Sequence, residues 1–264
     1  MTTSELKTIE SEIRNDLLLS RPKKYKRQDA VDFVEKYKGD TRLNVMTLVK
    51  TMKNTIAKYD IEEARIKKLI ECEKKYRRGY KVVAGIDEVG RGPLAGPVMT
   101  CALVLPANYS IHYVNDSKKV SARQREELAE VLKRDAISYC IGSCDNNEID
   151  EINILNATFL AMKKAIEGLS EEPDLVLVDA LTIPDIRMDQ VGIVHGDAKT
   201  FSIGAASIIA KVERDHLMEE LDSRYPGYGF RNNKGYGTRE HIEALMELGP
   251  CPIHRKTFIS QFIK

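Results

Sequence analysis

The pattern of apolar residues changes near residue 80, and this change constrains the fold more than any other feature of the chain. Beyond it, short apolar runs rich in β-branched residues alternate with longer stretches of helical spacing. Such alternation is typical of a sheet covered by helices. The expected strands are residues 82–87, 97–105, 136–142 and 174–179, and the expected helices are residues 121–134, 148–168 and 199–223. The sequence therefore predicts an α/β domain over residues 80–264, built on a mixed or parallel sheet.

Residues 1–79 have a different character. Apolar residues recur at helical spacing over residues 5–19 and 43–59, and residues 61–78 read as a charged helix that ends at Gly79. We predict a small helical extension here. Its basic runs, residues 21–27 and 74–78, have tyrosines interleaved, and they are either phosphate-binding segments or solvated surface.

Composition excludes few classes of protein. The formal net charge is only +1, because 41 basic residues nearly cancel 40 acidic ones, so charge alone does not indicate a nucleic-acid partner. No apolar stretch approaches the ~18 residues of a membrane helix, and residues 1–5 begin no secretory signal, so we expect a soluble cytoplasmic protein. The five cysteines are scattered and form neither a disulfide framework nor a zinc pair.

The first predicted strand ends in two carboxylates, Asp87 and Glu88, and opens into the turn Gly90, Arg91 and Gly92. Neighbouring residues of an ideal strand face opposite sides, so the pair can serve one centre only if the chain leaves extended geometry there. Glycine permits that change and lets backbone groups approach a ligand closely. The alternative is that both carboxylates are solvated turn residues.

Two further aspartates follow the same pattern. Asp179 ends another buried-strand candidate, and Asp197 precedes the helix expected from residue 199. Each has a structural alternative, since Asp179 can be a turn or capping residue and Asp197 can cap that helix. Together with Asp87 and Glu88 they form a set of four carboxylates, the oxygen ligands that two hard divalent cations such as Mg²⁺ or Mn²⁺ require. The five histidines are dispersed and offer no persuasive nucleophilic set.

Beyond these residues, a resemblance to a known family becomes specific. Six blocks occur in the order found in the type 2 ribonucleases H, in the bacterial form called ribonuclease HII. They read DEVGRGPLAGP (residues 87–97), NDSKKVS (115–121), VDA (178–180), GDAK (196–199), GAASIIAKVERD (204–215) and KGYGT (234–238). The similarity runs from about residue 80 to the C-terminus. Arg91 favours ribonuclease HII over the related ribonuclease HIII group, which lacks arginine at this position.

The resemblance implies a ribonuclease H-like mixed sheet flanked by helices, with a helical C-terminal region. It also implies an endonuclease that hydrolyses RNA in RNA–DNA hybrids and incises duplex DNA 5′ to embedded ribonucleotides, leaving 3′-hydroxyl and 5′-phosphate ends. Two divalent cations, Mn²⁺ or Mg²⁺, are the implied cofactors, and the implied cellular role is ribonucleotide excision and RNA primer removal. We expect a monomer.

The family's motifs assign a role to each matching residue. Asp87, Glu88, Asp179 and Asp197 match the catalytic and metal-binding carboxylates, and the Gly90, Arg91 and Gly92 turn matches the segment that senses the ribose 2′-hydroxyl. Tyr236 matches the tyrosine that stacks on the sugar, and Lys118, Lys119 and Ser207 match positions near the substrate backbone. His195, close to Asp197, departs from the lysine that is frequent there. Two other readings stay open: a catalytically silent hybrid-binding module, and a different metal nuclease that accepts all-DNA substrates.

Overall fold

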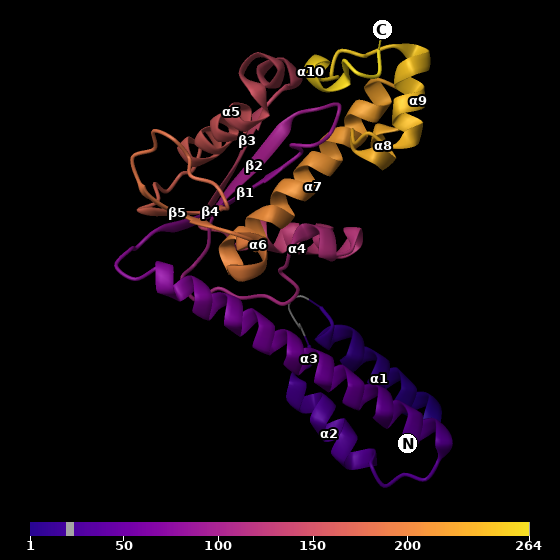
Figure 1. The fold of residues 1–264 in the computed structure, drawn as a ribbon. Coiled ribbons are helices and arrows are strands. Elements are labelled where there is room, and N and C mark those ends of the chain that lie inside the picture. Colours follow the sequence, from indigo (N-terminus) through magenta and orange to yellow (C-terminus); the bar gives the residue numbers. More distant parts are fainter. Residues whose placement is uncertain (20–23, 264) are drawn as a thin grey trace. The chain divides into compact units, whose positions relative to one another are not determined.

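The computed structural model describes residues 1–19 and 24–263, which divide into two compact units (Figure 1). Unit 1 comprises residues 1–71 with residues 110–113, and unit 2 comprises the rest of the chain. Residues 21–23 of the first basic run lie outside the described residues. The division that we expected at residue 79 stays a prediction.

Unit 1 is built from three helices, α1 (Thr3–Leu17), α2 (Arg27–Tyr37) and α3 (Leu43–Tyr76), the last of which continues into the residues of unit 2. Its core consists of apolar side chains repeated at helical spacing, among them Leu6, Ile13, Leu17, Phe33, Val45, Val49 and Met52. The sequence reading missed α2 altogether. It also divided α3 into two helices at residue 60, whereas Asp60 lies inside one continuous helix and pairs with Arg27 of α2 at 2.5 Å.

Unit 2 contains a five-stranded mixed sheet with the strand order β3-β2-β1-β4-β5. The strands are β1 (Val83–Val89), β2 (Val98–Val104), β3 (Ser138–Cys144), β4 (Leu175–Asp179) and β5 (Asp189–Ile193). β1 pairs antiparallel with β2 and parallel with β4, which in turn pairs parallel with β5. The predicted ribonuclease H-like mixed sheet with flanking helices is confirmed. β5 was not expected, because its polar, partly exposed residues suit an edge strand and lack an apolar run.

Long helices cover both faces of this sheet (Figure 1). Alternate residues of β4 face opposite sides: Val176 and Val178 pack with α5 (Asn146–Glu167), and Leu175 and Leu177 pack with Ile203 of α7 (Phe201–Arg224). The approach is close, since a Cβ at Gly85 of β1 would lie 2.4 Å from a backbone carbon of Ser202. The core thus holds the carboxyl ends of β1 and β4 in fixed positions.

The described part of unit 2 contains six further elements besides the sheet, α5 and α7. They are the 3-10 turn η1 (Ser117–Lys119), α4 (Ala122–Asp135), α6 (Gly196–Lys199), α8 (Phe230–Asn233), α9 (Arg239–Leu248) and α10 (Lys256–Ile259). The last three make the expected helical C-terminal region, which packs around Phe230, Leu245 and Ile259. None of the described helices is long and apolar enough to cross a membrane.

Candidate active site

The first two carboxylates are placed by β1. The strand continues through Glu88 to Val89, because β2 pairs with it from Ala84 as far as Val89, so the sequence-based end at Asp87 was two residues early. Both side chains nevertheless line one cavity of about 510 Å³. Asp87 is only 6% exposed, and Glu88 is half-buried with its Oε1 atom 3.3 Å from Nη1 of Arg91.

The parallel ladder between β1 and β4 brings the third carboxylate to the same place. Its last pair joins Ile86 to Val178, and Asp87 and Asp179 are the next residues of the two strands. Asp179 Oδ1 accepts a 2.7 Å hydrogen bond from the backbone N–H of Gly196, which begins α6. Asp197 follows directly in α6. It therefore lies inside a short helix, and the N-cap of α7 is Thr200.

The predicted site residues come together around this cavity. Its lining consists of Asp87, Glu88, Val89, Gly90, Arg91, Gly92, Asp116, Ser117, Lys118, Asp179, Asp197, Ser207, Lys211 and Tyr236. Lys119 does not line it, because the 3-10 turn directs this side chain into solvent, where Nζ lies 4.0 Å from Oδ2 of Asp116. The Tyr236 ring faces the turn, since a Cβ at Gly92 would lie 3.7 Å from the ring.

Four lining residues were absent from the predicted site, and one of them, Val89, is simply the residue of β1 that follows Glu88. Asp116 and Ser117 belong to the motif block at residues 115–121, and that block is the only feature of the sequence that could have indicated a place at the site. Ser117 Oγ lies 3.1 Å from Ser207 Oγ. Lys211 pairs with Asp215 at 2.6 Å. Lys211 thus both forms an ion pair and lines the cavity.

The electrostatics of the cavity oppose the accumulation of negative charge. Burial raises the pKa of Asp87 well above its ordinary value, and the charge of Glu88 raises it further, while the Ser207 hydroxyl acts in the opposite direction. Burial also raises the pKa of Glu88 against the influence of Arg91. The pKa of Asp197 is raised by burial and then by the charge of Asp179. Each shift reports a carboxylate without enough positive charge nearby.

The donor set fits divalent cations. Oε2 of Glu88 is buried and has no hydrogen-bond partner among the described residues, an expensive state unless a ligand satisfies it. In the described part of the chain, no group of three or more His, Cys, Asp or Glu side chains is arranged closely enough to hold a metal ion by itself. The carboxylates therefore surround a shared cavity without forming a closed cage.

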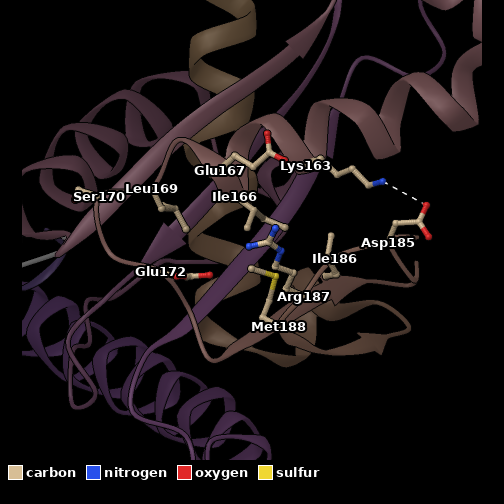
Figure 2. A pocket seen from close by; sticks show the side chains of 10 residues that line it. All are labelled: Lys163, Ile166, Glu167, Leu169, Ser170, Glu172, Asp185, Ile186, Arg187 and Met188. Carbon is tan, nitrogen blue, oxygen red and sulfur yellow. Dashed lines mark ion pairs between the residues drawn. The ribbon is translucent and has the colours of Figure 1, made fainter.

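A second cavity of about 510 Å³ lies beside α5 and the segment that leads into β5 (Figure 2). Lys163 and Asp185 face each other across 3.7 Å at one side of it, and Arg187 and Met188 project into the same region. None of the predicted site residues lines this cavity. The chemistry expected from the sequence is therefore gathered at the first cavity.

Comparison with known proteins agrees with this geometry. A family model described as Ribonuclease HII matches residues 84–261, and one described as Ribonuclease HII N-terminal domain matches residues 11–77. The chain belongs to the ribonuclease HII family. It is 55% identical over 204 residues to ribonuclease HII of Caldanaerobacter subterraneus, covering 77% of this chain and 85% of that protein. Over 225 residues it is 52% identical to ribonuclease HII of Lachnoclostridium phytofermentans, covering 85% and 88% of the two chains.

Solved structures show the same fold. The crystal structure of ribonuclease H2 from Pyrococcus horikoshii is 29% identical and superposes with a TM-score of 0.56, covering 69% of this chain and 99% of that one. The resemblance inferred from the sequence is thus confirmed. Ribonuclease HII enzymes are endonucleases that act on RNA–DNA hybrids and on embedded ribonucleotides, and the ribonuclease H family uses divalent metal ions.

Proposed function

We propose that the cavity at the ends of β1 and β4 is the catalytic site of this ribonuclease HII. The observation that carries the proposal is the convergence of four carboxylates from three separated segments on one cavity, beside a glycine-rich turn and a tyrosine. In this proposal Asp87, Glu88, Asp179 and Asp197 hold two divalent cations, and the partnerless Oε2 of Glu88 is one of the ligand atoms. Mg²⁺ and Mn²⁺ both suit oxygen ligands of this kind.

The bound cations would supply an activated water and neutralise charge on the departing oxygen. The chain itself orients the substrate. The Gly90-Arg91-Gly92 turn reads the ribose 2′-hydroxyl through backbone groups, because that hydroxyl is what distinguishes RNA from DNA. The Tyr236 ring, 39% exposed at the cavity, stacks on the sugar.

The substrate backbone meets the cationic and hydroxyl groups around η1. Lys118 and Ser207 line the cavity, and the exposed ammonium of Lys119 extends the contact along the strand. Cleavage on the 5′ side of the ribonucleotide then leaves 3′-hydroxyl and 5′-phosphate ends. In the cell this chemistry serves ribonucleotide removal from DNA and removal of RNA primers.

A duplex that carries one ribonucleotide tests the proposal beside an all-DNA duplex of the same sequence. With Mg²⁺ or Mn²⁺, the first should be incised 5′ to the ribonucleotide and the second left intact, and EDTA should stop the reaction. Binding without cleavage would indicate a silent hybrid-binding module. Cleavage of the all-DNA duplex would indicate a nuclease that ignores ribose.

The variant Asp87→Asn separates catalysis from binding. It removes a metal ligand with little change in shape, so cleavage should be abolished while duplex binding stays measurable. Asp185→Asn is the matched control, since Asp185 lines the other cavity and its side chain is 90% exposed. Near-normal turnover of Asp87→Asn would refute the assignment.

The monomeric state and the cytoplasmic location stay predictions, and light scattering in solution tests the first.

A further inference from the structure

Two arginines of unit 2 are completely buried without a carboxylate partner. Arg214 and Arg255 both have an exposed fraction of 0%, and neither makes an ion pair with any of the described residues. Fully buried arginine is rare unless it is paired, because a desolvated charge is costly. Burial accordingly lowers the pKa of Arg255 to about 9 and that of Arg214 to about 10. The desolvation of two guanidinium groups lowers the stability of the fold, so we examined which groups they bind.

The Arg255 guanidinium binds the turn itself. Its Nη2 donates to the carbonyl of Gly90 at 2.5 Å, its Nη1 to the carbonyl of Arg91 at 2.9 Å, and its Nε to the carbonyl of Gly96 at 2.9 Å. Lysine cannot reproduce this arrangement, since only a planar guanidinium presents several donors in a fixed fork. Arg255 therefore fixes two consecutive peptide groups of the proposed ribose-sensing turn.

Arg214 secures the segment that follows the turn and joins it to the tyrosine loop. It donates to the carbonyls of Ala95, Pro97 and Lys234 at 3.2, 3.0 and 2.9 Å. Its side chain also packs directly under Gly90, where a Cβ would lie 2.2 Å from Nε of Arg214. The turn and the loop that carries Tyr236 are thus held by the same buried group.

The consequence follows from peptide geometry. In a trans peptide the C=O of one residue and the N–H of the next point in opposite directions. When Arg255 draws the carbonyls of Gly90 and Arg91 inward, the N–H groups of Arg91 and Gly92 must point the other way. Both residues line the catalytic cavity.

We propose that Arg255, assisted by Arg214, is a positioning residue that sets ribose specificity by aiming the N–H groups of Arg91 and Gly92 at the substrate 2′-hydroxyl. This inference rests on the proposed function of the turn. It assigns the discrimination between RNA and DNA partly to a guanidinium that never touches the substrate. Misaligning backbone donors removes hydrogen bonds to the hydroxyl while leaving contacts with phosphates in place.

The test compares affinities for two duplexes, one with a single ribonucleotide and one all-DNA, by fluorescence anisotropy in EDTA. The ratio of the two dissociation constants is the readout, because any inactive fraction of a variant affects both constants equally and cancels. Arg255→Lys should lower the preference for the ribonucleotide about fivefold or more, the worth of one to two hydrogen bonds, with all-DNA affinity kept within about twofold. Arg231→Lys, at an exposed arginine of the same unit, is the matched control and should leave the ratio unchanged.

The outcomes distinguish a failure of the role proposed for Arg255 from a failure of the ribose-reading role proposed for the turn. A folded Arg255→Lys protein with the full wild-type preference would overturn the role of Arg255 and leave the site assignment standing. A wild-type protein without any preference would instead overturn the ribose-reading role of the turn. If Arg255→Lys does not fold, Arg255→Ala is measured with added guanidinium ion. Recovery of the preference supports the proposal, and failure to recover overturns it.

Discussion

The glycine that begins the turn gives the sharpest structural prediction, the effect of Gly90→Ala. Gly90 has φ +88°, a conformation that side chains with a Cβ rarely adopt. A Cβ at this position would lie 2.2 Å from Nε and 2.7 Å from Cδ of Arg214, and 2.8 Å from the carbonyl oxygen of Pro97. Arg214 is buried and bound to three carbonyls, so it has no room to move aside.

The expected magnitude has two parts. The positive φ costs a residue with a Cβ about 1–2 kcal/mol. Forcing a methyl group into a packed interior costs a further ~1–3 kcal/mol. The free energy of unfolding should therefore fall by about 2–5 kcal/mol, a large part of the stability of an ordinary domain. Because the turn can relieve the clash only by moving, incision at an embedded ribonucleotide should fall as well.

Two other glycines separate these parts when all three variants are unfolded in urea and followed by circular dichroism. Gly79 has φ +90° with nothing within 4 Å of a Cβ, so Gly79→Ala should show the backbone cost alone. Gly92 has neither a positive φ nor a contact closer than 3.7 Å, so Gly92→Ala should keep its stability. That methyl group would nevertheless face the substrate and should raise KM. The reasoning would be refuted by a Gly90→Ala protein no less stable than Gly79→Ala.

Three more predictions concern the cavity and the residues behind it. Tyr236→Ala should slow incision at a single embedded ribonucleotide, and an unaltered rate in steady-state assays would remove the stacking role. His254 is buried, and its Nε2 lies 3.1 Å from Nε2 of His241. Burial lowers the pKa of His254 to about 4 from 6.5, so stability should be lost as pH falls from 6.5 to about 4, by up to ~3 kcal/mol. His254→Gln should flatten that loss in denaturant titrations, and equal slopes for both proteins would contradict it. Because the pKa of Asp87 is raised, metal-free wild type should lose stability as pH rises above 3.8, the ordinary Asp value. Asp87→Asn should therefore melt higher in EDTA at neutral pH, an advantage that should shrink toward acid pH; a lower melting point would count against it.

The strands that carry the site were predictable because buried strands read as apolar runs. β1 and β4 each end in such a run followed by a carboxylate, and that pattern located Asp87 and Asp179. The end of β1 was not predictable. Glu88 and Val89 remain in the strand because β2 supplies hydrogen-bonding partners as far as Met99, and pairing of this kind leaves no local signal.

Whether a charged side chain faces the cavity, solvent or the interior depends on tertiary structure, which a single sequence shows only in part. Lys118 and Lys119 are adjacent and identical in type, yet only Lys118 lines the cavity, because the 3-10 turn sends the two side chains in different directions. Arg214 and Arg255 both look like surface residues in the sequence. Their burial depends on carbonyls from segments more than 100 residues away.

The arrangement of charge in unit 2 suits the metal site that we propose. Salt bridges between the buried guanidiniums and the cavity carboxylates would lower the cost of both, but would leave fewer carboxylate oxygens for metal ions. The fold avoids this by satisfying Arg214 and Arg255 with backbone carbonyls, while Oε2 of Glu88 is left without a partner in the described structure. Guanidinium and carboxylate groups without a partner of opposite charge lower the stability of the folded protein, as is common at sites that bind a ligand. Divalent cations should therefore raise the melting temperature of the wild type more than that of Asp87→Asn, and an equal rise in both proteins would show that the ions act elsewhere.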